Sequence, residues 1–157
     1  MTTDFQIQNI IKNVYQDLIK KDFFLLKNDA SERSITHRFA IYLENHLKEN
    51  FSDYHVDCEY NRDGIGLAAK TIRMEEDYEK LGYKLRRVFP DIIVHKRGEQ
   101  SGLIAIEIKK TNQSIDKDLK KLKAYKKVLK YPYAFQIIFP VKSKTNNIHL
   151  NSLITEI

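Results

Sequence analysis

Glu107 and Lys109 are the first pair of residues whose types and spacing suggest chemistry. They stand two positions apart in the run 103–109, whose apolar, β-branched character predicts a strand. Because side chains alternate across a strand, both leave one face, while the three isoleucines of the run leave the other. Burying a carboxylate and an ammonium costs on the order of several kcal/mol each unless they are paired or bound to a metal. A buried strand that carries both residues therefore indicates a site in which they are paired or bound to a metal.

Asp91 brings a second carboxylate to this strand. The run 88–95 predicts a neighbouring strand, and the polar turn at 97–102 predicts that the two strands form a hairpin. In such a hairpin Asp91 can lie beside Glu107. Their repulsion would raise the pKa of one carboxylate, whereas a hard divalent cation would favour both charged forms, and Mg²⁺ binds through one or two carboxylates plus water and phosphate. We therefore expect a divalent metal between Asp91 and Glu107.

Two amphipathic helices precede these strands and must help to position them. Apolar residues recur at spacings of three and four over 7–19, and again over 35–47, where Asp29 or Ser31 can cap the helix. Glu32 begins the apolar stripe of the second helix, so it is predicted to face inward near the site. The alternative is that Glu32 only complements the helix dipole, a stabilisation of about 0.3–1 kcal/mol.

The remaining runs complete an α/β order. We expect strands at 54–60 and 134–139, a helix over 115–129, and a short final strand within 148–154. The segment 61–84 is interpreted as a long connection or insertion, and as the place to look for substrate selection. The expected fold is a one-layer mixed sheet with helices on its faces, whose fourth strand is reached through a crossover helix.

Motif and order together resemble the PD-(D/E)xK nuclease superfamily. Phe89-Pro90-Asp91 and Glu107-Ile108-Lys109, separated by fifteen residues, look like its signature. The order of elements over 31–139 is similar to its αβββαβ core, the restriction-endonuclease-like fold. The resemblance implies one nuclease-like domain over 1–157, with an extra N-terminal helix within 1–28 and a possible insertion at 61–84.

The resemblance also implies a role for each residue of the motif. Asp91 and Glu107 would hold Mg²⁺, for which Mn²⁺ can substitute, and the carbonyl of Ile108 would complete the metal shell. Lys109 would act on the attacking water, and Glu32 looks like the extra helix acid that binds metal or orients its waters. The metal and the lysine would then polarise water for in-line attack on a phosphodiester. The implied activity is that of a Mg²⁺-dependent deoxyribonuclease, most simply an endonuclease.

Basic residues are predicted to contact nucleic acid around this centre. Nine lysines and no arginine lie between positions 109 and 130, and lysines supply contacts to the phosphate backbone without reading bases. The alternative is that the lysines form an ordinary solvated helix face. The expected contacts are Arg33, His37, Arg86, Arg87, Lys110, Lys117, Lys120 and Lys121.

Composition bounds these expectations. A chain of 157 residues with 42% hydrophobic content is long enough for one domain with a buried core, and a net charge of +6 suits a polyanionic partner. The single cysteine, Cys58, excludes an internal disulfide and a cysteine-based zinc site. No apolar run approaches the roughly 18 residues of a membrane span, and the start of the chain lacks a leader pattern. We therefore expect a cytoplasmic protein with no membrane partner.

A second hypothesis is a non-catalytic nucleic-acid-binding or scaffold protein with a nuclease-like fold. A Pro-Asp and a Glu-x-Lys at this distance also occur by chance in lysine-rich chains, where they would form a structural ion pair. The presence of Asp91, Glu107 and Lys109 together favours catalysis. RNA as the substrate stays an alternative to DNA, and a homodimer, common among related endonucleases, is possible by analogy only.

Overall fold

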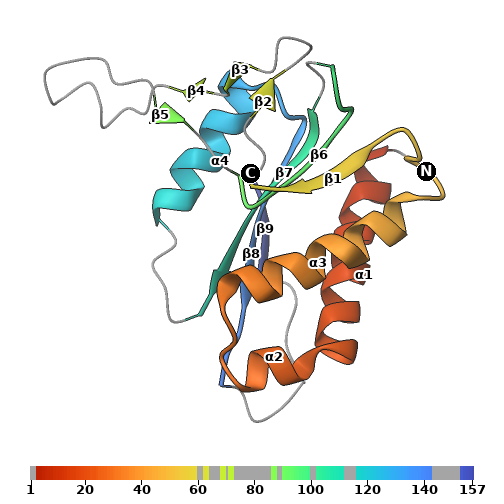
Figure 1. The fold of residues 1–157 in the computed structure, drawn as a ribbon, viewed down its shortest axis with the longest axis vertical. Helices are drawn as coiled ribbons and strands as arrows, with labels where there is room; N and C mark the ends of the chain where they lie inside the picture. The colour runs from red at the N-terminus through yellow and green to blue at the C-terminus, as the bar shows by residue number, and fades with distance from the viewer. Residues whose placement is uncertain are drawn as a thin grey trace, which may run out of the picture.

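A five-stranded mixed sheet forms the centre of the molecule (Figure 1). The computed structural model describes residues 3–59, 62–63, 68–69, 71–72, 86–87, 90–99, 102–111, 116–142 and 153–157. Among the described strands of this sheet, β7 and β8 pair in parallel and the other neighbours are antiparallel. In spatial order the strands are β1 (His55–Cys58), β6 (Ile92–His95), β7 (Gly102–Lys110), β8 (Tyr133–Phe139) and β9 (Ile154–Glu156).

Helices cover both faces of this sheet. On one face, α1 (Thr3–Lys21) and α3 (Glu32–Leu47) pack against Ile104, Ile106 and Ile108 of β7, and the short α2 (Phe23–Lys27) links them. On the other face, α4 (Asp116–Val128) packs Leu122 and Tyr125 against smaller residues of the sheet. The expected α/β class, with a mixed sheet between helices, is confirmed.

The second long helix begins where its cap predicts. The Ser31 side chain accepts a hydrogen bond from the Ser34 N–H at 3.2 Å and so satisfies one of the free donors of the first turn. Asp29, the other predicted cap, instead forms an ion pair with Lys110, whose Nζ lies 2.7 Å from Asp29 Oδ1. This cap places Glu32 at the first position of α3.

The predicted hairpin is formed by β6 and β7, with Ile92 opposite Ile106 and a turn in which Gly98 has φ +82°. β6 begins at Ile92, later than the predicted 88, and positions 88–89 lie outside the described residues. Pro90 has no N–H to give to a ladder, so the strand starts after it. The predicted crossover is also confirmed, because α4 connects the parallel pair β7 and β8.

Two predicted segments are described only in part. Within 61–84 the structure describes β2 (Arg62–Asp63), β3 (Ala68–Ala69) and β4 (Thr71–Ile72); β2 pairs with β3, and β4 pairs with β5 (Arg86–Arg87). Most of the proposed insertion therefore lies outside the described residues, as do positions 148–152 of the predicted last strand. Among the residues described, no helix is long and apolar enough to cross a membrane.

Candidate active site

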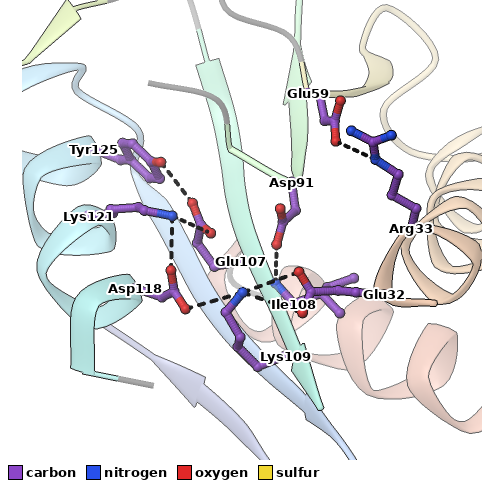
Figure 2. A network of polar contacts seen from close by, with 10 residues as sticks. All are labelled: Glu32, Arg33, Glu59, Asp91, Glu107, Ile108, Lys109, Asp118, Lys121 and Tyr125. Carbon is purple, nitrogen blue, oxygen red and sulfur yellow. Dashed lines mark hydrogen bonds and ion pairs between the residues drawn. The ribbon is translucent and has the colours of Figure 1, made fainter. Parts of the chain in front are cut away.

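The predicted catalytic residues meet at one end of the sheet, between the first turns of α3 and α4. Figure 2 shows Glu107 on the α4 side of β7, Asp91 and Glu32 on the α3 side, and the Lys109 ammonium between them. The Lys109 Nζ lies 3.2 Å from Glu32 Oε1, although the two residues are 77 positions apart in the chain. The fold thus brings the four residues into one neighbourhood.

Asp91 is half-buried and turned toward the edge of β7. Its Oδ2 accepts a hydrogen bond from the Ile108 N–H at 2.7 Å, beyond the last paired residue of β6. Burial raises the pKa of Asp91 to about 6, although the Ile108 N–H and the Lys109 charge oppose the rise. Because the N–H and C=O of one strand residue point to the same edge, the Ile108 carbonyl is directed to the Asp91 side. That orientation is the one its implied metal role requires.

Glu107 is 1% exposed, and both of its oxygens have partners on α4. The Tyr125 hydroxyl donates to Oε1 at 2.8 Å, and the Lys121 ammonium lies 3.3 Å from Oε2. Burial, followed by the charge of Asp91, nevertheless raises the pKa of Glu107 to about 7. The cation and the hydroxyl therefore compensate only part of the cost of ionising this carboxyl group.

Lys109 lies between two acids. Its Nζ is 3.2 Å from Glu32 and 3.5 Å from Asp118 Oδ2. Burial works to lower the pKa of Lys109, but the Asp118 and Glu32 carboxylates outweigh it and hold that pKa above the usual value. Lys109 is thus a charged hydrogen-bond donor at neutral pH.

A cleft of about 370 Å³ opens on the α3 side of these residues. Arg33 and His37, both predicted nucleic-acid contacts, line it beside the acids Glu32 and Asp91. Arg33 lies at the exposed surface, with its Nε 3.3 Å from Glu59 Oε1. The full lining is Glu32, Arg33, Thr36, His37, Cys58, Glu59 and Asp91.

The other predicted nucleic-acid contacts are distributed differently. Lys121 points into the site, where it meets Glu107 and Asp118. Lys110 points away from it, to Asp29 and the Ala30 carbonyl, and Lys120 is exposed on α4. The backbone of Arg86 and Arg87 forms β5, but their side chains and that of Lys117 lie outside the described residues.

Sequence reasoning missed Asp118, Tyr125 and Glu59 as parts of the site. Asp118 and Tyr125 fall seven positions apart on the helix stripe that faces the sheet, so their spacing is a signal for facing Glu107. Glu59 carries no such signal. It has a left-handed backbone (φ +50°) just after β1, and its N–H donates to the Asp91 carbonyl at 3.1 Å.

The donor set suits a hard divalent cation, but the side chains are not gathered as ligands. In the described part of the chain, no three His, Cys, Asp or Glu residues are grouped closely enough to hold a metal. Asp91 and Glu107 still offer the carboxylate oxygens that Mg²⁺ prefers, and both have a raised pKa that a cation would relieve. Lys121 is the group that a metal at Glu107 would have to displace or share.

Comparisons with known proteins assign this chain to no family. No protein-family model matches it, and no curated protein matches it. A solved structure titled "Crystal structure of SSO0001" is similar over 99% of this chain and 75% of that chain, with 15% identity and a TM-score of 0.34. A similarity at that level shows neither a shared fold nor a shared function.

Proposed function

We propose that this protein is a metal-dependent nuclease of the PD-(D/E)xK type that hydrolyses phosphodiester bonds of DNA. The observation that carries the proposal is the pair of incompletely compensated carboxylates, Asp91 and Glu107, beside the charged Lys109. Perturbed acids next to a positioned cation are typical of catalytic sites. The order α3, β1, β6, β7, α4, β8 supports the proposal, because it follows the αβββαβ order of the restriction-endonuclease-like core.

Asp91 and Glu107 would hold Mg²⁺ or Mn²⁺, and the Ile108 carbonyl and Glu32 would complete its surroundings. When bound, the metal supplies charge stabilisation at the phosphate and a water of lowered pKa. For the chain itself, Asp91 and Glu107 are acids whose pKa is raised mainly by burial, and a nearby cation would offset the cost of ionising them. Because a metal would stabilise the charged forms of these two acids, the site favours metal binding.

Lys109 would hold the attacking water or a phosphate oxygen through its ammonium. Its Nζ is already fixed between Glu32 and Asp118, so little reorganisation is needed when substrate arrives. Lys121, on the other side of Glu107, would shift from Glu107 toward the phosphate while it keeps its contact with Asp118. Each role requires the cationic form, and the pKa of both lysines is raised because nearby carboxylates outweigh the opposing effect of burial.

The nucleic-acid strand would lie along the cleft that Arg33 and His37 line. Arg33 has a weak, exposed partner in Glu59, and an exposed pair of this kind contributes at most about 1 kcal/mol. A phosphate can therefore replace Glu59 at little cost. The exposed lysines of α4, among them Lys120, Lys123 and Lys127, would add contacts to the backbone of the bound strand.

The test is cleavage of supercoiled plasmid, linear duplex, single-stranded DNA and RNA with Mg²⁺ or Mn²⁺. We expect the wild type to cut DNA in a metal-dependent reaction. The cleavage rate should fall by about 100-fold or more in Asp91→Asn and in Lys109→Met. Asp22→Asn is the matched control, because it removes an ion-paired acid between α1 and α2 whose partners, Arg38 and Tyr42, lie on α3. A folded wild type that binds DNA but cuts neither DNA nor RNA would instead establish the binding-protein hypothesis.

A further inference from the structure

Asp118 lies between the two lysines of the site and contacts both of them. It lies in the first turn of α4 and contacts two lysines, with Oδ1 2.9 Å from Lys121 Nζ and Oδ2 3.5 Å from Lys109 Nζ. Its side chain is only 5% exposed. Because each oxygen of this buried carboxylate contacts a different ammonium, Asp118 can hold the two lysines at fixed positions relative to each other.

The position of Asp118 is fixed by the packing of α4. Leu122 and Tyr125, four and seven residues further along the same stripe, are fully buried against the sheet. Lys121 holds Oδ1 from the next turn of the same helix. Asp118 Oδ2 is consequently presented to Lys109 from a rigid element, with little freedom to turn away.

Glu32, the other acid at Lys109, is less constrained. Its side chain is 27% exposed and lines the open cleft, where the proposed substrate and metal waters would compete for it. If Glu32 turns toward a metal-bound water, Lys109 loses that partner. Asp118 then remains as the acid that keeps the ammonium directed at the reaction centre.

We infer that Asp118 is a positioning residue of this site, which holds the Lys109 ammonium in place for the reaction while Lys121 anchors its second oxygen. The inference rests on the proposed nuclease function. Asp118 touches neither the phosphate nor the attacking water and acts through Lys109. The simpler explanation is that an acid in the first turn only stabilises α4 through the helix dipole, so the test has to separate the two roles.

The experiment compares Asp118→Asn with the wild type and with the control Asp22→Asn in single-turnover cleavage, in DNA binding with Ca²⁺ and in thermal melting. We expect the Asp118→Asn cleavage rate to fall by about 10- to 100-fold, while DNA affinity changes by less than about threefold. The control should cleave at the wild-type rate. Asp118→Glu, which keeps the charge, should recover part of the lost rate.

A double-mutant cycle with Lys109→Met identifies the route of the effect. If Asp118 acts through Lys109, adding Asp118→Asn to Lys109→Met should cost no more than about twofold further. Equal losses in both backgrounds, or a wild-type rate in Asp118→Asn, would overturn the positioning role and leave the nuclease proposal intact. A wild type without any metal-dependent cleavage would overturn both.

Discussion

Two clusters of charged side chains on this sheet differ in how fully the neighbouring cations compensate the charge of their acids. Asp57 on β1 lies 2.8 Å from His95 Nε2 and 2.9 Å from Arg97 Nε. Its pKa is lowered, chiefly by the Arg97 hydrogen bond and with help from His95, although burial opposes this. This cluster stabilises the charged carboxylate and behaves as a structural ion pair.

In the cluster around Asp91 and Glu107, at the other end of β6, the pKa of the acids is raised rather than lowered. Lys109 and Lys121 lie among four acids, and burial still raises the pKa of Asp91 to about 6 and that of Glu107 to about 7. A sheet that can compensate an acid fully at Asp57 does not do so here. Under the proposed function, the second cluster is the one that would take up a cation and a substrate.

The largest expected difference between the two clusters is in catalysis. Glu107→Gln should reduce metal-dependent DNA cleavage by about 100-fold or more, because it removes a proposed metal ligand while the side chain keeps its shape. Asp57→Asn should leave the rate within about threefold. Equal losses in the two variants, measured on folded protein, would contradict the assignment of distinct roles.

Metal binding should distinguish the clusters by thermal melting without any substrate. At pH 8, saturating Mn²⁺ should raise the melting temperature of the wild type and of Asp57→Asn by about 5–10 °C. Asp91→Asn should lose most of this shift. The gain should shrink at pH 5, where protons compete with the metal for Asp91 and Glu107. A shift that survives in Asp91→Asn would place the metal elsewhere.

The pH dependence of stability should have opposite signs at the two clusters. Glu107 has a raised pKa, so the folded state binds more protons than the unfolded state between about pH 4.5 and 7, and its contribution to stability is lost as pH rises through that window. Asp57 has a lowered pKa, so its contribution is present above about pH 4 and is lost below.

Chemical denaturation of metal-free protein checks these signs. At pH 8, Glu107→Gln should unfold with a free energy higher by on the order of 1–3 kcal/mol than the wild type, because one pKa unit corresponds to about 1.4 kcal/mol. Asp57→Asn should be lower by about 1–3 kcal/mol at the same pH. A destabilised Glu107→Gln protein would mean that the ion pair with Lys121 dominates at this acid.

The smallest expected effect concerns the exposed face of α4. Lys123→Ala and Lys127→Ala should each weaken DNA binding by a few-fold and reduce the slope of log affinity against log salt by about 0.9. Lys21→Ala on α1 serves as the control, because it removes one exposed lysine of the other helical layer. Equal slopes in all three variants would show that α4 is an ordinary solvated face.

Local periodicity made much of the architecture predictable. The alternation in β7 separates Glu107 from the isoleucines, and the helical stripes identify α1, α3 and α4, because strand and helix geometry repeat over a few residues. The hairpin turn then limits where Asp91 can lie relative to β7. The sequence by itself therefore determined the candidate centre and the kind of sheet that carries it.

Packing between layers decided the rest. The contact of Lys109 with Glu32 joins residues 77 positions apart in the chain, and its contact with Asp118 depends on how α4 packs against β7. Lys110, next to Lys109 in sequence, points instead to Asp29, because adjacent strand residues face opposite sides of the sheet. Which lysine enters the site, and which acid holds it there, depends on how α3 and α4 lie against β7, and the tertiary structure alone specifies that arrangement.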